Sequence, residues 1–226
     1  MISVIVPAYI PSEKHHNLLL RAIKSLESQT YKNFEVICVL NGCYIDYKDI
    51  ISTIKSNLDI RFITLEGKTS GAIARNTGVR VSKYDFIAQL DADDQYHPKK
   101  LEKQIQFFED NPEYDFVGTL AADYQSDGTI KDSCYLPGQY QTHESIANSI
   151  DRENMMCHGS IMFRKKSFNK MGGYNENNKP GIFWLSAGRV MWEDWDLWIR
   201  SVKNGMRFYN IPERLYYWST GTGVER

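Results

Sequence analysis

Several common features are scarce or missing in this sequence. Only four of the 226 residues are cysteines, and no two of them form a CxxC pair, which argues against a disulfide framework and a zinc site. No apolar run approaches the roughly 20 residues that a membrane-spanning helix needs. The apolar N-terminal segment is short and has no basic region, so we expect no secretory signal. These absences predict a protein of the reducing cytoplasm, with at most peripheral contact at the inner face of a membrane.

Net charge is also nearly absent. The 27 basic and 28 acidic residues give a formal charge of −1, which provides no general attraction to nucleic acid, so we expect no nucleic-acid partner. Hydrophobic residues make up 42% of the chain and charged residues 24%, values that argue against disorder, collagen and coiled coil. Aromatic residues are abundant, and core packing or a ligand site would each explain them.

Short apolar runs alternate with helical patterns through the first half of the chain. We expect strands at 3–6, 34–40, 60–65 and 85–90, and helices at 17–29, 47–56, 71–81 and from Pro98 onward. This alternation predicts an α/β fold with a mostly parallel sheet covered by helices on both faces. Ligands of such sheets bind outside the carboxyl ends of the strands. Tyr9, Asn41 and the acidic run at 91–94 all follow strand ends and are expected there.

The second half of the chain is less regular. We expect strands at 114–124, 160–163, 206–211 and 215–218, helices at 142–149 and 193–203, and turns at 125–128 and 171–174. The chain contains no repeat and no clear linker. We therefore expect a single domain over 1–226, with a Rossmann-like, nucleotide-binding half at about 1–123 and a more variable half at about 124–226.

The acidic run Asp91-Ala92-Asp93-Asp94 directly follows an apolar strand. Crowded carboxylates repel one another unless a cation or hydrogen-bond donors offset the repulsion. Mg²⁺ or Mn²⁺ prefers oxygen ligands, and a diphosphate often completes the coordination shell. The alternative is a solvated loop that caps the next helix.

A second acidic cluster, at 192–196, reads Trp192-Glu193-Asp194-Trp195-Asp196 and starts a predicted helix. One interpretation is a general base flanked by the indole rings of Trp192 and Trp195, which could stack on a sugar. The alternative is that the acids only favour the helix N-terminus.

The segment Gly71-Ala72-Ile73-Ala74-Arg75-Asn76-Thr77-Gly78 lacks the GK[ST] ending of a Walker loop. Its arginine either reaches a phosphate or base, or makes a structural ion pair. His158, in Cys157-His158-Gly159-Ser160, is either a structural histidine or part of the site.

Taken in order, these motifs resemble those of the family 2 glycosyltransferases, which have the GT-A fold. The resemblance runs from Ser3 to about Trp218. It rests on the segments SVIVPAY at 3–9, SQTY at 28–31, NFE at 33–35, ARNTG at 74–78, LDADD at 90–94, MGGY at 171–174 and EDWDLW at 193–198.

The resemblance implies a site for a nucleotide-diphosphate sugar, with UDP as the expected nucleotide. Tyr9 would lie beside the base, Asp91 would contact the ribose or share the metal, and Asp93 would bind Mn²⁺ or Mg²⁺ on the diphosphate, with Asp94 as the alternate. The expected donor-binding residues are Pro7, Ala8, Tyr9, Asn41, Arg75, Asp91, Ala92 and Asp93.

The resemblance also implies the reaction and the acceptor side. Asp194 would be the catalytic base of an inverting transfer, and His158, Trp192 and Glu193 would line the acceptor site. The expected activity is hexosyl or N-acetylhexosaminyl transfer to a saccharide or glycolipid, in polysaccharide, glycolipid or other glycoconjugate synthesis. The oligomeric state is left open.

Two departures from the family pattern keep alternatives open. Leu40 stands where many members carry the acid that pairs with the base edge, although Asn41 offers a substitute. Ile10-Pro11 replaces the usual asparagine after the first-strand tyrosine, which predicts a different loop path. A non-catalytic nucleotide-sugar binding protein is the main alternative. A nucleotidyltransferase is disfavoured, since no glycine-rich phosphate loop follows the first strand.

Overall fold

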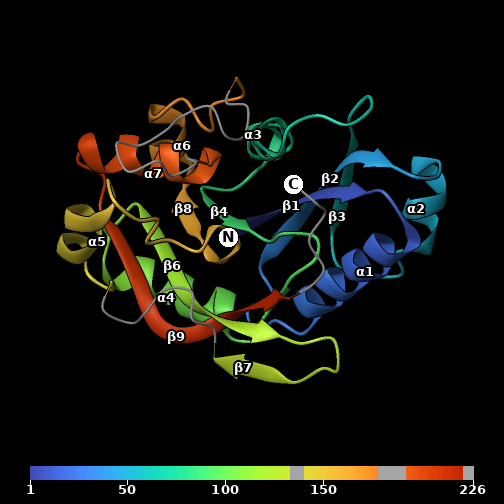
Figure 1. Ribbon diagram of the computed structural model, residues 1–226, viewed down its shortest axis with the longest axis horizontal. Coiled ribbons are helices and arrows are strands. Elements are labelled where there is room, and N and C mark those ends of the chain that lie inside the picture. Colours follow the sequence, from blue (N-terminus) through green and yellow to red (C-terminus); the bar gives the residue numbers. More distant parts are fainter. Residues whose placement is uncertain (133–139, 178–191, 221–226) are drawn as a thin grey trace.

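The computed structural model describes residues 1–132, 140–177 and 192–220 (Figure 1). The first half contains β1 (Ile2–Ile10), α1 (Glu13–Glu27), β2 (Phe34–Cys43), α2 (Tyr47–Thr53), β3 (Ile60–Thr64), α3 (Gly71–Val81), β4 (Phe86–Gln89), β5 (Gln95–Tyr96) and α4 (Lys100–Asp110). The second half contains β6 (Phe116–Tyr124), β7 (Ile130–Asp132), α5 (His143–Ser149), a 3₁₀ turn (His158–Ser160), β8 (Met162–Arg164), α6 (Lys165–Lys170), α7 (Glu193–Lys203) and β9 (Phe208–Ser219).

The nine strands within these described ranges belong to one sheet, whose order is β3-β2-β1-β4-β8-β6-β9-β5, with β7 paired to β6. β1 to β4 are mutually parallel, β8 is antiparallel to both β4 and β6, and β9 is parallel to β6. β1, β2, β3, β4, β6 and β9 therefore run in one direction. The predicted α/β class with a mostly parallel sheet is confirmed.

Helices cover both faces of the sheet, as the continuous apolar strands require (Figure 1). Alternate residues of β1 point to opposite faces, so Val4 and Val6 pack with α1, α2 and α4, whereas Ile5 packs with α3. α5, α6 and α7 contribute to the same apolar cluster as α3. The sheet is thus buried between two helical layers.

The structure corrects several expected boundaries. The predicted strands at 206–211 and 215–218 are one strand, β9, because irregular register with β6 near Leu120 absorbs the polar residues between them. β2 does not end in a turn at Asn41-Gly42. It continues to Cys43, with Gly42 at a φ of +85°, and Ile10 pairs with Cys43 past a register shift. The longer β2 pairs with the end of β1, and this pairing sets the point at which the chain leaves β1 before Pro11. β5, β7 and α6 are too short for a clear sequence pattern.

The cysteines within the described residues are free thiols that are buried or partly buried. Cys38, Cys43 and Cys157 are free, and burial raises the pKa of Cys38 to about 12. Cys134 lies outside the described residues. Within the described part of the chain, no helix combines the length and apolar content needed to cross a bilayer.

A close contact sets the distance between α3 and the sheet. Gly78 faces β1, and a Cβ built on it would lie 2.4 Å from Cγ2 of Ile5 and 3.3 Å from Cγ2 of Val39. No side chain fits in that space without moving the helix. The same helix carries Arg75 three residues earlier, just under one turn away, so this contact also influences where that guanidinium lies.

We expect Gly78→Ala to destabilise the protein. Alanine gains about 0.5–1 kcal/mol in helix propensity, but overpacking in a rigid core costs about 1–3 kcal/mol. The overlap with Ile5 is severe, so the cost should dominate, and urea unfolding should show a loss of about 1–2 kcal/mol. Arg80→Ala, at an exposed position on the same helix, should stay within about 0.5 kcal/mol of wild type. Equal stability of the two variants would contradict the packing argument.

Candidate active site

The carboxyl ends of β1, β2 and β4 bring three predicted segments to one edge of the sheet. Ile5 is in register with Ile37 of β2 and with Gln89 of β4, so the residues that follow these positions leave the sheet together. Pro7 and Tyr9 are partly exposed at this edge, while the side chain of Ala8 is buried in the core. A ligand can therefore reach Ala8 only through its backbone.

Arg75 connects the acidic turn after β4 to the start of α7. Its guanidinium donates to Asp91 Oδ1 at 2.7 Å and to Glu193 Oε1 at 3.0 Å. The side chain of Arg75 is only 11% exposed. Burial alone lowers the pKa of Arg75, but the carboxylates of Asp91 and Glu193 outweigh it and hold that pKa above its ordinary value. The ion-pair interpretation of Arg75 is thus correct for this structure, and it places donor-side and acceptor-side residues together.

A missing side chain makes room for this arginine. Gly71 opens α3, and a Cβ built there would lie 2.6 Å from a guanidinium nitrogen of Arg75 and 3.2 Å from Glu193 Oε1. Ser70 caps the helix by accepting a hydrogen bond from the Ile73 backbone at 3.2 Å. Residues 70–75 therefore start α3. The absence of a side chain at Gly71 leaves the space in which the guanidinium of Arg75 reaches Glu193 of α7.

The three carboxylates of the acidic turn at 91–94 differ in their exposure to solvent and in their partners. Asp91, Ala92 and Asp93 are partly exposed, whereas Asp94 is buried. Asp94 Oδ2 accepts a hydrogen bond from the Tyr216 hydroxyl at 2.5 Å, and Oδ1 accepts one from the Ser219 backbone at 2.7 Å. Burial and the neighbouring acids hold the pKa of Asp94 well above its usual range. Both oxygens of Asp94 are engaged, so it is not an alternate metal ligand here.

Helix α1 also supports this turn. Arg21 donates to the backbone oxygen of Asp93 at 2.9 Å and to the hydroxyl of Ser219 at 2.6 Å. The end of β9 and the acidic turn are therefore held by one arginine. No sequence motif pointed to Arg21, Tyr216 or Ser219, because their partners are about 70 to 200 residues away in the chain.

At the end of β2, Asn41 is used by the fold itself. Its side-chain oxygen accepts from the backbone of Thr69 at 2.6 Å and from the Thr69 hydroxyl at 2.8 Å, and its amide donates to the Thr69 backbone oxygen at 3.0 Å. One amide hydrogen of Asn41 remains for a ligand. The adjacent Lys68 places its ammonium 4.3 Å from the centre of the Tyr9 ring, so 68–69 and Tyr9 line the same end of the site.

The second acidic cluster begins α7. Trp192 precedes the helix, and Asp194 is buried, with Oδ2 accepting a hydrogen bond from the Asn154 amide at 2.8 Å. Trp195 and Trp198 are buried in the apolar core. The interpretation that the Trp195 indole ring stacks on a sugar is therefore wrong, since α7 turns this ring inward, where its nitrogen donates to the backbone oxygen of Ile150.

His158 lies among the same charges. Its Nε2 forms a hydrogen bond with the hydroxyl of Tyr174 at 2.8 Å, and its ring meets that of Trp198 edge-on. Burial and the nearby Arg75 hold the pKa of His158 below its ordinary value, although Asp194 acts in the opposite direction. Burial and Arg75 both favour the neutral form of His158, and its hydrogen bond to Tyr174 ties the histidine to the turn at 171–176.

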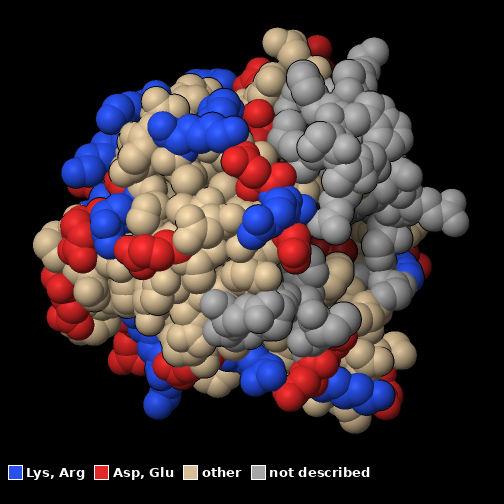
Figure 2. Space-filling model, turned by 60° about the vertical axis from the view of Figure 1, so that its left-hand side comes forward, with Lys and Arg blue, Asp and Glu red and all other residues tan. Residues whose placement is uncertain are grey.

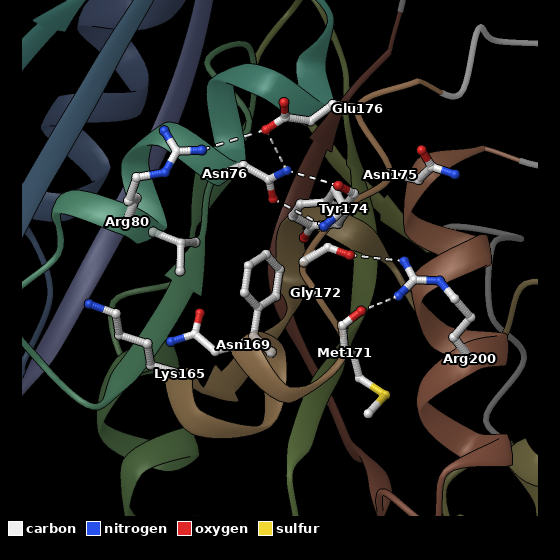
Figure 3. Close-up of a pocket in the computed structure, with 13 residues that line it drawn as sticks. Asn76, Arg80, Lys165, Asn169, Met171, Gly172, Tyr174, Asn175, Glu176 and Arg200 are labelled. Atoms are coloured by element: carbon white, nitrogen blue, oxygen red, sulfur yellow. Dashed lines mark hydrogen bonds and ion pairs between the residues drawn. The ribbon is translucent and has the colours of Figure 1, made fainter.

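The turn at 171–176 that carries Tyr174 is fastened from two helices (Figure 3). Asn76 of α3 exchanges hydrogen bonds with the backbone of Tyr174 at 2.8 and 3.0 Å, and Arg200 of α7 donates to the carbonyls of Met171 and Gly173. These groups line an open pocket of about 840 Å³. Because the side chains of Asn76 and Arg200 already form hydrogen bonds with the backbone of this turn, their role is to hold the turn in place.

Asp91 and Asp93 are the two residues predicted to hold a divalent ion. The described residues contain no group of three or more His, Cys, Asp or Glu side chains that could enclose a metal. Asp91 and Asp93 nevertheless suit Mg²⁺ or Mn²⁺, which is commonly held by one or two carboxylates together with substrate phosphates. Lys and Arg are interspersed with Asp and Glu on the face shown in Figure 2, which includes no extended area of one sign.

With the fold and this geometry in place, comparison with known proteins identifies the family. The family model described as "Glycosyl transferase family 2" matches residues 3–172. The chain belongs to this family, and the resemblance inferred from the motifs is confirmed.

Relatives and solved structures agree with this assignment. EpsE of Bacillus subtilis (strain 168) is 30% identical over 200 residues, which are 88% of this chain and 66% of EpsE. The O-antigen biosynthesis glycosyltransferase WbnJ of Escherichia coli is 30% identical over 221 residues, 95% of this chain and 78% of WbnJ. The crystal structure of S. aureus TarS 1-349 in complex with UDP-GlcNAc has a TM-score of 0.74 at 17% identity and covers 99% of this chain and 59% of that one. The fold is of the GT-A type.

The two neighbouring acids of the turn give a test. Asp94→Ala would leave the Tyr216 hydroxyl and the Ser219 backbone without their buried partner, so we expect a loss of about 1–3 kcal/mol in the free energy of unfolding. Asp93→Ala removes a partly exposed carboxylate and should change stability by less. Chemical unfolding of both variants in the same buffer checks this. Equal losses, or a larger loss for Asp93→Ala, would contradict the division of roles.

Proposed function

We propose that this chain is an inverting glycosyltransferase domain that moves a sugar from a nucleotide-diphosphate sugar to an acceptor hydroxyl. The observation that carries the proposal is the Arg75 network, in which one guanidinium pairs with Asp91 at 2.7 Å and with Glu193 at 3.0 Å. It brings the acidic turn expected to hold the donor next to the helix that carries Asp194. A transfer reaction needs both groups in one site.

The donor is proposed to bind in the half of the domain at about 1–123. Tyr9 would lie beside the base, and Pro7, Ala8 and Ala92 would contact the nucleotide. Asp91 and Asp93 would hold Mn²⁺ or Mg²⁺, which when bound offsets the negative charge that develops on the leaving diphosphate.

UDP is the proposed nucleotide. The TarS structure, which shares the fold, is a complex with UDP-GlcNAc. The remaining amide hydrogen of Asn41 can donate to a carbonyl oxygen of uracil, a contact that Leu40 cannot supply. We propose a hexosyl or N-acetylhexosaminyl group as the transferred sugar.

The half at about 124–226 is proposed to bind the acceptor, with His158, Trp192 and Glu193 at its surface. The acceptor hydroxyl gives its proton to Asp194 while its oxygen attacks C1 of the sugar from the face opposite the leaving group. The bond from C1 to the phosphate oxygen breaks, and its electron pair leaves with the nucleoside diphosphate. One base and one displacement give inversion, and no covalent enzyme intermediate forms.

We propose a saccharide or glycolipid as the acceptor, in polysaccharide, glycolipid or other glycoconjugate synthesis. The relative WbnJ is an O-antigen biosynthesis glycosyltransferase, which supports this context. We further propose a cytoplasmic site of action with at most peripheral contact at the inner face of a membrane.

Paired substitutions test the mechanism. We expect Asp93→Ala to abolish the Mn²⁺-dependent release of UDP from a UDP-sugar. Asp194→Asn keeps the size of the side chain but cannot take a proton, so it should retain donor binding and lower turnover on the order of 10²- to 10⁴-fold. Both expectations are checked on each variant by measuring donor affinity with calorimetry and by measuring UDP release. Turnover by Asp194→Asn within about threefold of wild type would remove Asp194 as the base.

The second candidate is a non-catalytic nucleotide-sugar binding protein of the same fold. Leu40 and the engagement of Asn41 with Thr69 favour it, because both reduce recognition of the base edge. Tight binding of donor and Mn²⁺ without transfer across a broad acceptor panel, and without hydrolysis, would support this candidate.

A further inference from the structure

Glu193 and Asp194 are consecutive residues at the start of α7, yet they have different partners. Glu193 pairs with the guanidinium of Arg75, whereas Asp194 accepts a hydrogen bond from the neutral amide of Asn154 at 2.8 Å. Burial alone raises the pKa of Glu193, but Arg75 outweighs it and holds that pKa below its ordinary value. A neutral amide fixes the position of a carboxylate without placing a full positive charge beside it. The partners therefore distinguish the two acids.

The orientation of the Asn154 amide is determined by its other contact. Its side-chain oxygen accepts a hydrogen bond from the backbone of Met156 at 3.2 Å. The amide nitrogen consequently faces Asp194, which is the only arrangement that places a donor, rather than a second oxygen, against a carboxylate. Asn154 therefore bridges a backbone group and a single oxygen, Oδ2, of Asp194.

The segment that carries Asn154 is itself held firmly against α7 and β9. The ring nitrogen of Trp195 donates to the backbone oxygen of Ile150 at 2.6 Å, and the amide of Asn210 donates to that of Met155 at 2.9 Å. Met155 and Met156 are buried in the apolar cluster that contains Trp195. The position of Asn154 is thus fixed by packing as well as by hydrogen bonds, as a precise support requires.

The contact leaves the second oxygen of the carboxylate available. Among the described residues, Asp194 Oδ2 takes the hydrogen bond from Asn154, and Oδ1 has no hydrogen-bond partner. A carboxylate held through one oxygen presents the other in a fixed direction. That direction is what a base needs in order to meet an acceptor hydroxyl at hydrogen-bond distance.

We propose that Asn154 is the positioning residue of Asp194, holding Oδ2 so that Oδ1 receives the proton of the acceptor. This inference rests on the proposed function. Asn154 contacts the base and not the reacting atoms, so its loss should lower turnover while donor binding is retained.

Two variants separate positioning from structure. Asn154→Asp keeps the size of the side chain and the oxygen that faces Met156, but it replaces the amide donor with a carboxylate that repels Asp194. Asn154→Ala removes the whole group. The matched controls are Asn169→Asp and Asn169→Ala, which make the same changes on an exposed residue of α6.

The readout is Mn²⁺-dependent UDP release from UDP-hexoses and UDP-N-acetylhexosamines, with water as the acceptor. The donor used is the one that the wild-type protein hydrolyses fastest, and Asp194→Asn is measured on the same donor. We expect kcat to fall about 10- to 100-fold in both Asn154 variants, with KM and the melting temperature near those of wild type and the Asn169 controls unchanged.

The other possible results distinguish a failure of the positioning role from a failure of the proposed function. If kcat stays within about twofold of wild type in both Asn154 variants while Asp194→Asn is inactive, the positioning role is wrong and the proposed base stands. The same holds if the Asn154 variants lose only stability or donor affinity. If Asp194→Asn is active, or if wild-type protein turns over no donor, the proposed function fails and this inference fails with it.

Discussion

A single guanidinium, that of Arg75, lies between a carboxylate of the acidic turn and a carboxylate of α7. Removing one partner from such a buried pair typically costs about 3–5 kcal/mol, because the remaining charge is left in a poorly hydrated place. The three elements that supply the network are consequently restricted together. The acidic turn cannot move away from α7 without exposing Arg75 or leaving it unpaired, so the network favours keeping the proposed donor-side and acceptor-side groups together.

A second group of contacts supports the same turn from the opposite side. Asp94 points into the protein and fixes the end of β9, while Arg21 reaches the turn from α1. The acidic run thus combines two uses of the same residue type. Its buried carboxylate belongs to the fold, and its partly exposed carboxylates are the ones proposed to hold the metal. Sequence spacing alone could not distinguish them, because all the acids follow the same strand.

Much of the fold was predictable from the sequence, and the reason is local. Continuous apolar runs and helical spacing identified β1 to β4 and their helices, and parallel pairing then implied that the segments after these strands would meet. The second half was harder. β9 is one strand because its irregular pairing with β6 tolerates polar residues, and such pairing leaves no local pattern.

The candidate site shows the same limit. Short-range motifs pointed to Arg75, Asp91 and Asp194, whereas Asn154 and Tyr216 act through partners that are 40 and 122 residues away. The interpretation of Trp195 as a ring that stacks on a sugar failed for a related reason. Helix α7 begins at the edge of the site, but Trp195 and Trp198 lie on the side of this helix that faces the core.

The two glycines of α3 have a consequence for redesign of this protein. Gly71 leaves space for a guanidinium, and Gly78 leaves space for a strand, so opposite ends of one helix are fitted to different neighbours. A library that changes donor preference should therefore keep positions 71 and 78 as glycine, although neither glycine is expected to touch the donor. Diversity is better placed at Lys68, which is exposed and lies beside Tyr9, whereas the hydroxyl of Thr69 is bonded to Asn41.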